Sequence, residues 1–283
     1  MKKLTLAIIT MIISLSAAAQ QQFRHPLDDL ETVYKDENVT FRKIDDHTWV
    51  GSGNVMSSET MYIIEGKKRA ILLDAGTVIP GLDKIVAQIT DKPVTLMLTH
   101  VHPDHAGAVD CFGEVWINPA DTVMMPAFMP NYKGEVKYLK HGEKIRLGGR
   151  TLEVYFTPGH TPGSTTFLER GTETGYSGDS YGNGNLLVFS DFQTLIKMCR
   201  DSHNYFAKKG YKKFLCGHYF GLNAETLERI KLVETMATEL LEGKVNGDST
   251  GVHGTGLDRV LMRDNFRLNY AAERLQAERE SLK

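Results

Sequence analysis

The chain has 283 residues, of which 41% are hydrophobic and 24% charged, and its formal net charge is −2. This length and composition predict one globular domain with a substantial core. The small net charge and the lack of any long lysine or arginine run argue against a nucleic-acid partner. The three scattered cysteines, Cys111, Cys199 and Cys216, are too few for a disulfide framework.

Residues 1–19 have the pattern of a secretory signal peptide. Two lysines precede an apolar run from Leu4 to about Leu15, and small residues follow as far as Ala19. This run is shorter than the roughly 18 to 20 residues that a spanning helix needs, so cleavage near Ala19 is expected rather than a stable membrane anchor. We therefore expect a periplasmic or secreted protein, with an uncleaved N-terminal anchor as the alternative.

A polar segment at residues 20–38 precedes a series of short stretches rich in β-branched and aromatic residues. These stretches predict consecutive strands in VTFRKI, TWVGSG, TMYIIEG and RAILLDAG. GLDKIVAQIT then has helical spacing, and the apolar strand VTLMLTH follows it. A strand, a helix and a further strand indicate a layered α/β arrangement.

The middle of the chain continues the alternation of strands and helices. We expect EVWIN to be a strand, PADTVMMPAF a short helix with proline in its first turn, and KIRLGGRTLEVYF a hairpin that turns at Gly148 and Gly149. STTFLE and GYSGD are two more predicted strands. A helix at about residues 191–208, the strand KKFLCGH and a helix from Asn223 to near Gly243 follow.

The C-terminal 39 residues differ from the rest of the chain. Residues 39–244 are expected to form the main domain, and residues 245–283 a loop with a helical extension. The loop is rich in glycine, serine and threonine, and the final stretch LMRDNFRLNYAAERLQAERESLK is predicted as one charged amphipathic surface helix.

The stretch LTHVHPDHAGA, residues 98–108, contains three histidines and an aspartate within six residues. Side chains two positions apart in an extended chain project to the same side, so His100 and His102 can reach one metal ion. Pro103 then turns the chain, so that Asp104 and His105 approach from another direction. Two adjacent metal positions are the expected result.

A metal site built only from this stretch would be incomplete, because zinc takes three or four nitrogen, oxygen or sulfur ligands. Three further candidates lie in glycine-marked loops after predicted strands: His160 in TPGHTPGS, Asp179 in YSGDS and His218 in LCGHYFG. Such loops at strand ends are where ligands gather in open α/β sheets. The three loops and the histidine cluster are therefore all expected to lie at strand ends.

In order and spacing these elements, together with AILLDAG around Asp74, resemble those of the metallo-β-lactamase-fold hydrolases. The resemblance covers roughly residues 40–222. It implies an α/β fold in the form of a four-layer αββα sandwich, with two zinc ions at one edge and iron or manganese as alternatives. The implied ligands are His100, His102 and His160 for one ion and Asp104, His105 and His218 for the other, with Asp179 between them. Asp74 would support the site without binding metal, and Ser180 is the alternative to Asp179.

The expected function is hydrolysis of a small carbonyl compound: an ester, a thioester, a lactone or a β-lactam. The resemblance implies a metal-bridging hydroxide as nucleophile, with Asp104 as the catalytic residue that orients it and moves a proton. One alternative is a glyoxalase II-like thioesterase, whose intracellular thiol substrate conflicts with a signal peptide. The other is a noncatalytic metal-binding module, which is disfavoured because all seven ligand positions are filled. The oligomeric state is not predicted.

Overall fold

The computed structural model describes residues 27–55, 58–219, 225–249, 252 and 254–283. The predicted signal peptide lies outside these ranges. Within them, no helix combines the length and the apolar character that crossing a bilayer requires.

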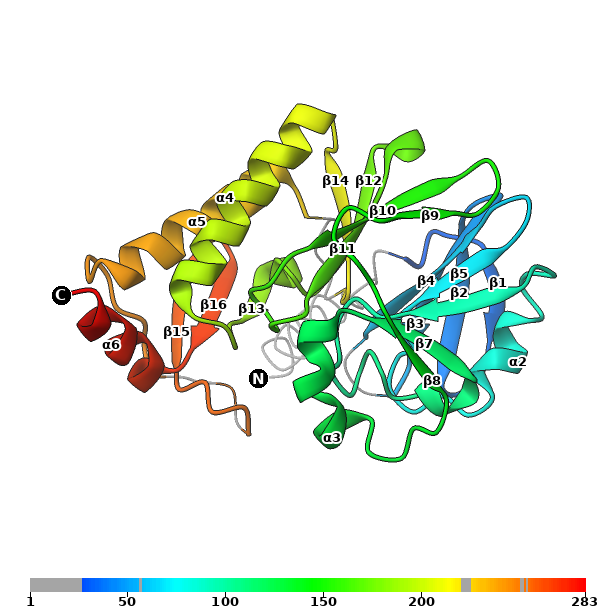
Figure 1. Cartoon of the computed structure of the whole chain (residues 1–283), viewed down its shortest axis with the longest axis horizontal. Coiled ribbons are helices and arrows are strands. Elements are labelled where there is room, and N and C mark those ends of the chain that lie inside the picture. The colour runs from blue at the N-terminus through cyan, green and yellow to red at the C-terminus, as the bar shows by residue number, and fades with distance from the viewer. Residues whose placement is uncertain (1–26, 56–57, 220–224, 250–251, 253) are drawn as a thin grey trace, which may run out of the picture.

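An eight-stranded sheet forms the N-terminal half of the protein (Figure 1). Its strands follow one another in chain order: β1 Thr32–Lys35, β2 Val39–Asp45, β3 Thr48–Gly53, β4 Thr60–Glu65, β5 Ala70–Leu73, β6 Val94–Met97, β7 Glu114–Ile117 and β8 Glu135–Tyr138. Strands β1 to β5 pair antiparallel, and β5 to β8 pair parallel. The strands expected from residue 39 onward are confirmed, and β1 adds a strand within the segment expected only to be polar.

A second sheet has five strands in the order β14-β12-β11-β10-β9. Their bounds are β9 Lys144–Arg146, β10 Thr151–Phe156, β11 Thr165–Glu169, β12 Thr174–Gly178 and β14 Lys213–Cys216. The β9–β10 hairpin turns as predicted at Gly148 and Gly149, both of which have φ near +86° to +87°. A left-handed backbone of this kind favours glycine, because glycine has no Cβ to clash.

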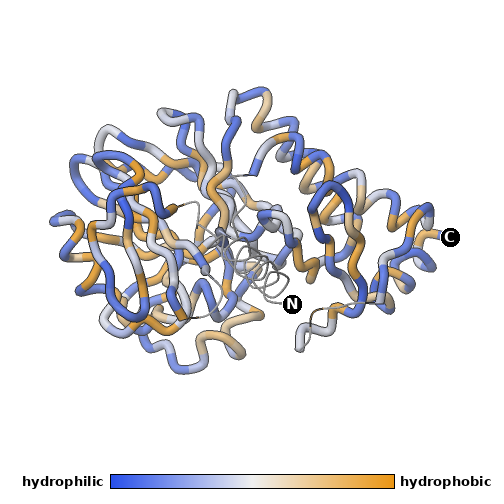
Figure 2. The backbone as a smooth tube through the Cα atoms, turned by 180° about the vertical axis from the view of Figure 1, so that it is seen from behind, coloured by the Kyte–Doolittle hydropathy of each residue, from blue (hydrophilic) through white to orange (hydrophobic). Residues whose placement is uncertain are grey.

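Three buried hydrophobic clusters separate four layers of secondary structure. One lies between the large sheet and the helices α2 (Leu82–Val86) and α3 (Met125–Phe128), and one lies between the sheets. The third lies beneath α4 (Phe192–Lys209) and α5 (Leu227–Leu241). Successive side chains of β4 enter two different clusters, because Met61 and Tyr62 point to opposite faces of the sheet. This is the predicted αββα sandwich, and Figure 2 shows hydrophobic and hydrophilic stretches alternating along the backbone.

Several helices are shorter than expected or begin elsewhere. The stretch predicted to be helical at residues 81–90 is an α-helix only as far as Val86, and PADTVMMPAF splits into the 3-10 helix η2 (Pro119–Val123) and α3. Pro126 explains the split, because proline has no N–H to continue the ladder. Helix α5 begins after Thr226, whose hydroxyl accepts from the Arg229 N–H. The expected N-cap, Asn223, lies outside the described residues.

The prediction of one continuous helix over residues 261–283 is wrong in its first part. Strands β15 (Arg259–Arg263) and β16 (Phe266–Tyr270) form a hairpin there, and only α6 (Ala272–Ser281) is helical. Asp264 and Asn265 both have positive φ, as a two-residue hairpin turn requires. Strand β16 also pairs parallel with β13 (Asn185–Leu187), so the C-terminal segment completes a sheet that begins within the main domain.

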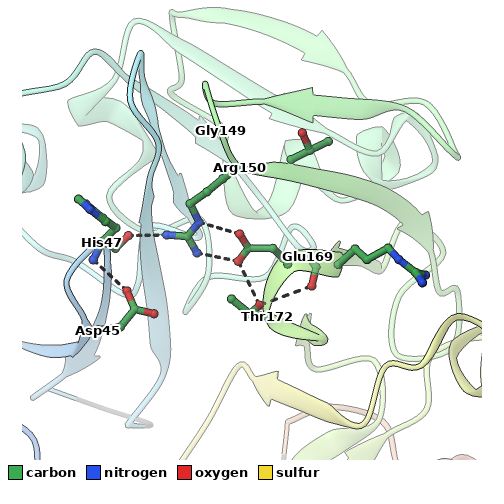
Figure 3. A pocket seen from close by; sticks show the side chains of 9 residues that line it. Asp45, His47, Gly149, Arg150, Glu169 and Thr172 are labelled. Carbon is green, nitrogen blue, oxygen red and sulfur yellow. Dashed lines mark hydrogen bonds and ion pairs between the residues drawn. The ribbon is translucent and has the colours of Figure 1, made fainter.

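Arg150 joins the two large sheets. It lies directly before β10, whereas His160 follows the other end of this strand. Its Nε and Nη2 donate to the two carboxylate oxygens of Glu169, each at 2.6 Å, and its Nη1 donates to the carbonyl of His47 at 2.7 Å (Figure 3). Planar, paired hydrogen bonds of this kind hold both partners in one geometry. Arg150 lines a surface pocket, but its donors are used within the protein, so it acts as a clamp between the sheets.

Candidate metal centre

The seven predicted ligands meet where strands of both sheets end. The loop after β6 carries His100, His102, Asp104 and His105. His160 follows β10, Asp179 follows β12, and His218 follows β14. Residues more than 100 positions apart in the chain are thereby brought to one edge of the sandwich, as the strand-end argument predicted.

The ligand atoms form three groups, and within each group they lie no more than 4.8 Å apart. The groups are His100, His102 and His160; His100, His105 and Asp179; and Asp104, His105 and His218. We call the first group the first position and the third group the second position. Asp179 lies between them, since its Oδ2 is 3.6 Å from His160 Nε2 and 3.2 Å from His218 Nε2. Ser180 points elsewhere and bonds Thr157.

Hydrogen bonds to protein groups orient the rings of the first position. The Nδ1–H of His160 donates to the Leu187 carbonyl at 2.7 Å, which leaves Nε2 with a free lone pair that faces His102 Nδ1 at 2.9 Å. His100 Nδ1 lies 3.1 Å from the Thr99 hydroxyl, so its Nε2 faces the cluster. An outer partner of this kind fixes both the tautomer and the direction of a ligating histidine.

Asp74 lies behind the cluster and contacts Thr99 and His105. Its carboxylate accepts from the Thr99 N–H at 2.7 Å, from the Thr99 hydroxyl at 2.8 Å and from His105 Nδ1 at 2.9 Å. Its backbone has φ of 65°, a conformation that aspartate tolerates better than most residues. Asp74 therefore occupies the supporting position expected from the sequence.

Two glycines allow the loops to approach one another closely. A Cβ at Gly217 would lie 2.1 Å from Asp179 Oδ1 and 2.7 Å from a carbon of the His105 ring. A Cβ at Gly178, where φ is +51°, would lie 2.3 Å from the Thr99 hydroxyl. Any larger residue at either position would displace the ligands or the group that supports them.

Asp121, a fully buried aspartate in η2, was not predicted from the sequence. Its Oδ2 accepts from the Val101 N–H at 2.8 Å and from the Thr161 hydroxyl at 3.1 Å, and its Oδ1 accepts from the Gly163 N–H at 2.6 Å. Burial raises the pKa of this carboxyl. Asp121 thus ties the loop of His100 and His102 to the loop of His160. The only sequence signal was an aspartate in a largely apolar stretch, four positions after the end of a strand.

The two positions differ in charge. Burial holds the pKa of His100 well below its usual value, lowers that of His102 to about 3 and lowers that of His160. The three rings of the first position are therefore neutral and have lone pairs to offer a metal.

The second position carries paired charges. Against the opposing effect of burial, the carboxylates of Asp179 and Asp104 hold the pKa of His105 well above its usual value, and Asp179 does the same, less strongly, for His218. Burial also opposes ionisation of Asp179, but His218 and His105 hold its pKa well below its usual value. This half of the cluster thus pairs carboxylates with imidazoles that hold their protons more tightly than usual, and a metal ion that binds here would displace those protons.

The donor set fits divalent metal ions. The buried Nε2 of His100 has no hydrogen-bond partner among the described residues, although it lies within two of the three ligand groups. A buried polar atom without a partner is costly, and a cation at this point would satisfy it. Imidazole nitrogen with a small share of carboxylate is the ligand chemistry that zinc favours.

Comparison with known proteins identifies the family. The family whose sequence model matches residues 57–239 is described as the metallo-beta-lactamase superfamily. This chain belongs to that superfamily. The family predicted from the motifs is thereby confirmed, and its fold agrees with the four layers described above.

Relatives of this superfamily member include hydrolases, one of which is named as a thioesterase. The chain is 24% identical over 234 residues to "Acyl-coenzyme A thioesterase MBLAC2" of Gallus gallus, which covers 65% of this chain and 84% of the relative. It is 28% identical over 159 residues to "Hydroxyacylglutathione hydrolase GloC" of Haemophilus influenzae, with 49% and 75% covered. The solved metallo-beta-lactamase from Pontibacter korlensis shares the fold, with a TM-score of 0.57 at 17% identity over 71% of this chain and 99% of that one. The hydrolase relatives favour an enzyme over a noncatalytic module.

Proposed function

We propose that this superfamily member is an exported zinc hydrolase that cleaves thioesters or closely related carbonyl compounds. The observation that carries the proposal is that seven histidine and aspartate side chains converge in three groups, each compact enough to hold a metal ion. The hydrolase relatives support the reaction class. Export is supported only by the signal-peptide pattern of residues 1–19.

Two ions would occupy the cluster. His100, His102 and His160 would hold one, and Asp104, His105 and His218 the other, with Asp179 shared. Such ions, when bound, lower the pKa of water so that hydroxide is available at neutral pH, and they polarise a carbonyl group.

Asp104 is the group best placed to move protons. Its side chain is 25% exposed and its Oδ2 lies 3.3 Å from His218 Nε2, so it reaches both the cluster and the solvent. Burial opposes its ionisation, but His105 and His218 hold the pKa of Asp104 below its usual value, so the carboxylate is available as a proton acceptor. It can take a proton from the nucleophilic water and return it to the leaving group.

Two residues keep the ligands in position during this reaction. Asp74 fixes the His105 ring through Nδ1, and Asp121 fixes the backbone on both sides of the first position. Positioning of this kind contributes to the rate because the reacting groups are already aligned.

Thioesters are the first substrate class to test, because one of the relatives is named as a thioesterase. Oxygen esters, lactones and β-lactams share the reacting carbonyl and remain the alternatives within the proposal. A protein exported from the cytoplasm would meet thioesters other than those of intracellular thiols.

The test is hydrolysis by the zinc-loaded protein from Gln20 onward, with an acyl thioester, an oxygen ester, a lactone, a chromogenic cephalosporin and a phosphodiester. We expect turnover of the thioester that a chelator abolishes and zinc restores, with two metal ions per chain by elemental analysis. Metal-free protein, or two bound ions without turnover of any carbonyl substrate, would contradict the proposal. Iron or manganese in the purified protein would change the metal assignment alone.

The matched control is Asp104→Asn, which keeps the size of the side chain but removes the proton acceptor. We expect turnover to fall by at least about a hundredfold while the first position keeps its metal. Full activity in this variant would remove Asp104 from the mechanism.

A further inference from the structure

Two phenylalanines flank His102 of the first position. The ring of Phe128 lies 5.5 Å from the His102 ring at 90°, and the ring of Phe189 lies 5.5 Å from it at 81°. Phe189 also lies 5.6 Å from the ring of His160. Both phenylalanines are partly exposed. We call this pair the apolar wall.

The apolar wall is held in place by the surrounding backbone. Phe128 ends α3, and its N–H donates to the Met124 carbonyl at 3.1 Å. The N–H of Phe189 donates to the His160 carbonyl at 3.2 Å, and the Phe189 carbonyl accepts from Arg274 Nη1 at 2.7 Å. A surface fixed in this way loses little entropy when a ligand covers it.

The other side of the cluster is charged. Asp104, Asp179 and His218 keep 25%, 15% and 11% of their side chains exposed. A molecule bound at the cluster therefore meets an apolar surface beside the first position and a charged surface beside the second.

Resting on the hydrolase function proposed above, we propose that the apolar wall is an acyl subsite. Phe128 and Phe189 would cover the hydrocarbon part of the acyl group, so that substrates with a medium-length alkyl chain are preferred over acetyl compounds. Full burial of one methylene strengthens binding about fourfold, so a surface that covers it on one side gives about twofold.

The test is a series of thioesters that share one thiol and carry acetyl, butyryl, hexanoyl or octanoyl groups. For the zinc-loaded protein, kcat/KM should rise about 50-fold from acetyl to octanoyl. Phe128→Ala and Phe189→Ala should each reduce this octanoyl-to-acetyl ratio about tenfold, while Phe189→Leu should keep most of it. A ratio near one in the native protein, or equal losses at every chain length, would overturn the proposal.

The matched control is Phe112→Ala. Phe112 is also partly buried, and it packs on the same hydrophobic cluster as Phe128, but it has no ring contact with a ligand histidine among the described residues. Its substitution should leave the ratio unchanged. Zinc content is measured for all variants, so that a lost ligand is not mistaken for a lost subsite.

A binding measurement separates this proposal from the function on which it rests. Acetate, hexanoate and octanoate are titrated into the zinc-loaded protein by calorimetry. Tighter binding of octanoate that is lost in Phe189→Ala would support the subsite even if no carbonyl substrate is hydrolysed, in which case the proposed function is wrong. Hydrolysis with equal affinity for all three acids would keep the function and overturn the subsite.

Discussion

The two halves of the metal cluster are built in different ways. The first position consists of three neutral histidines, and backbone or hydroxyl groups such as the Leu187 carbonyl orient two of the rings. The second position consists of two histidines and a carboxylate, and Asp74 and Asp179 contact the same His105 ring. Hydrogen bonds to neutral groups of the fold therefore orient the histidine rings of the first position, whereas carboxylates orient the His105 ring of the second. Metal affinity at the two positions should respond to different substitutions.

The largest expected effect separates the two positions directly. His160→Ala should release metal chiefly from the first position, and His218→Ala chiefly from the second, each with a loss of activity greater than the 10- to 100-fold that mutation of an outer partner costs. Metal content after dialysis against a weak chelator measures this. Unchanged zinc content in His160→Ala would contradict the assignment of the first position.

Asp74→Ala should weaken the second position. The His105 ring loses the acceptor of its Nδ1–H, so metal affinity there should fall 10- to 100-fold, with a smaller change at the first position. Competition with a chromophoric chelator gives both affinities. Asp110→Ala, which removes an exposed aspartate near the same loop, is the control and should change neither. An equal loss at both positions would show that Asp74 supports the whole cluster rather than one half.

Asp121→Asn should act on the first position through the backbone. The amide nitrogen must face either the Val101 N–H or the Gly163 N–H, so one buried donor loses its acceptor. Such a loss costs about 1 to 3 kcal/mol of folding free energy. Urea unfolding measures this cost, and metal titration should show a weaker first position than second. Native stability in this variant would contradict the bridging role.

The smallest effect on the metals is expected from Glu225, a buried residue that pairs with Phe214 of β14 and acts on pH-dependent stability. Burial raises its pKa to about 8, above its ordinary value of 4.5. The folded state therefore holds the proton more tightly than the unfolded chain. Stability from the protonated carboxyl is complete below pH 4.5 and is lost as the pH rises to about 8.

Glu225→Gln keeps the neutral form at every pH. From pH 5 to pH 8 the variant should gain stability relative to the native protein, by no more than about 5 kcal/mol, with no change above that range. Urea unfolding of both proteins in chelator at pH 5, 6.5 and 8 gives the difference. A stability difference that is constant across this range would show that the pKa of Glu225 is not raised in the folded protein.

The layers and the convergence of the seven candidate ligands could be predicted because both depend on local sequence. Strands such as β4 and β5 are short apolar runs bounded by turn residues, and each ligand lies in a short motif beside a strand end. Asp121 could not be predicted, because its partners Val101 and Gly163 lie 20 and 42 residues away. The apolar wall depends in the same way on the end of α3 and the segment after β13, which both reach His102 only in the fold.

The C-terminal hairpin shows why a charged stretch can mislead. Charges between apolar residues suggested an amphipathic helix, but Phe266, Leu268 and Tyr270 alternate with a period of two and are buried. The segment is a strand rather than a helix because it pairs with β13. Asn269 of β16 donates a hydrogen bond to Asn185 of β13, 84 residues earlier in the sequence. The identity of a partner strand so distant cannot be read from the local pattern.

The pairing of β16 with β13 has a consequence for biosynthesis. Strand β13 carries Leu187, which anchors His160, and Glu278 of α6 accepts from the first N–H groups of α4. All seven ligands leave the ribosome long before residues 266–278 do. A chain that lacks residues 266–278 therefore carries all seven candidate ligands but lacks part of the scaffold that aims His160.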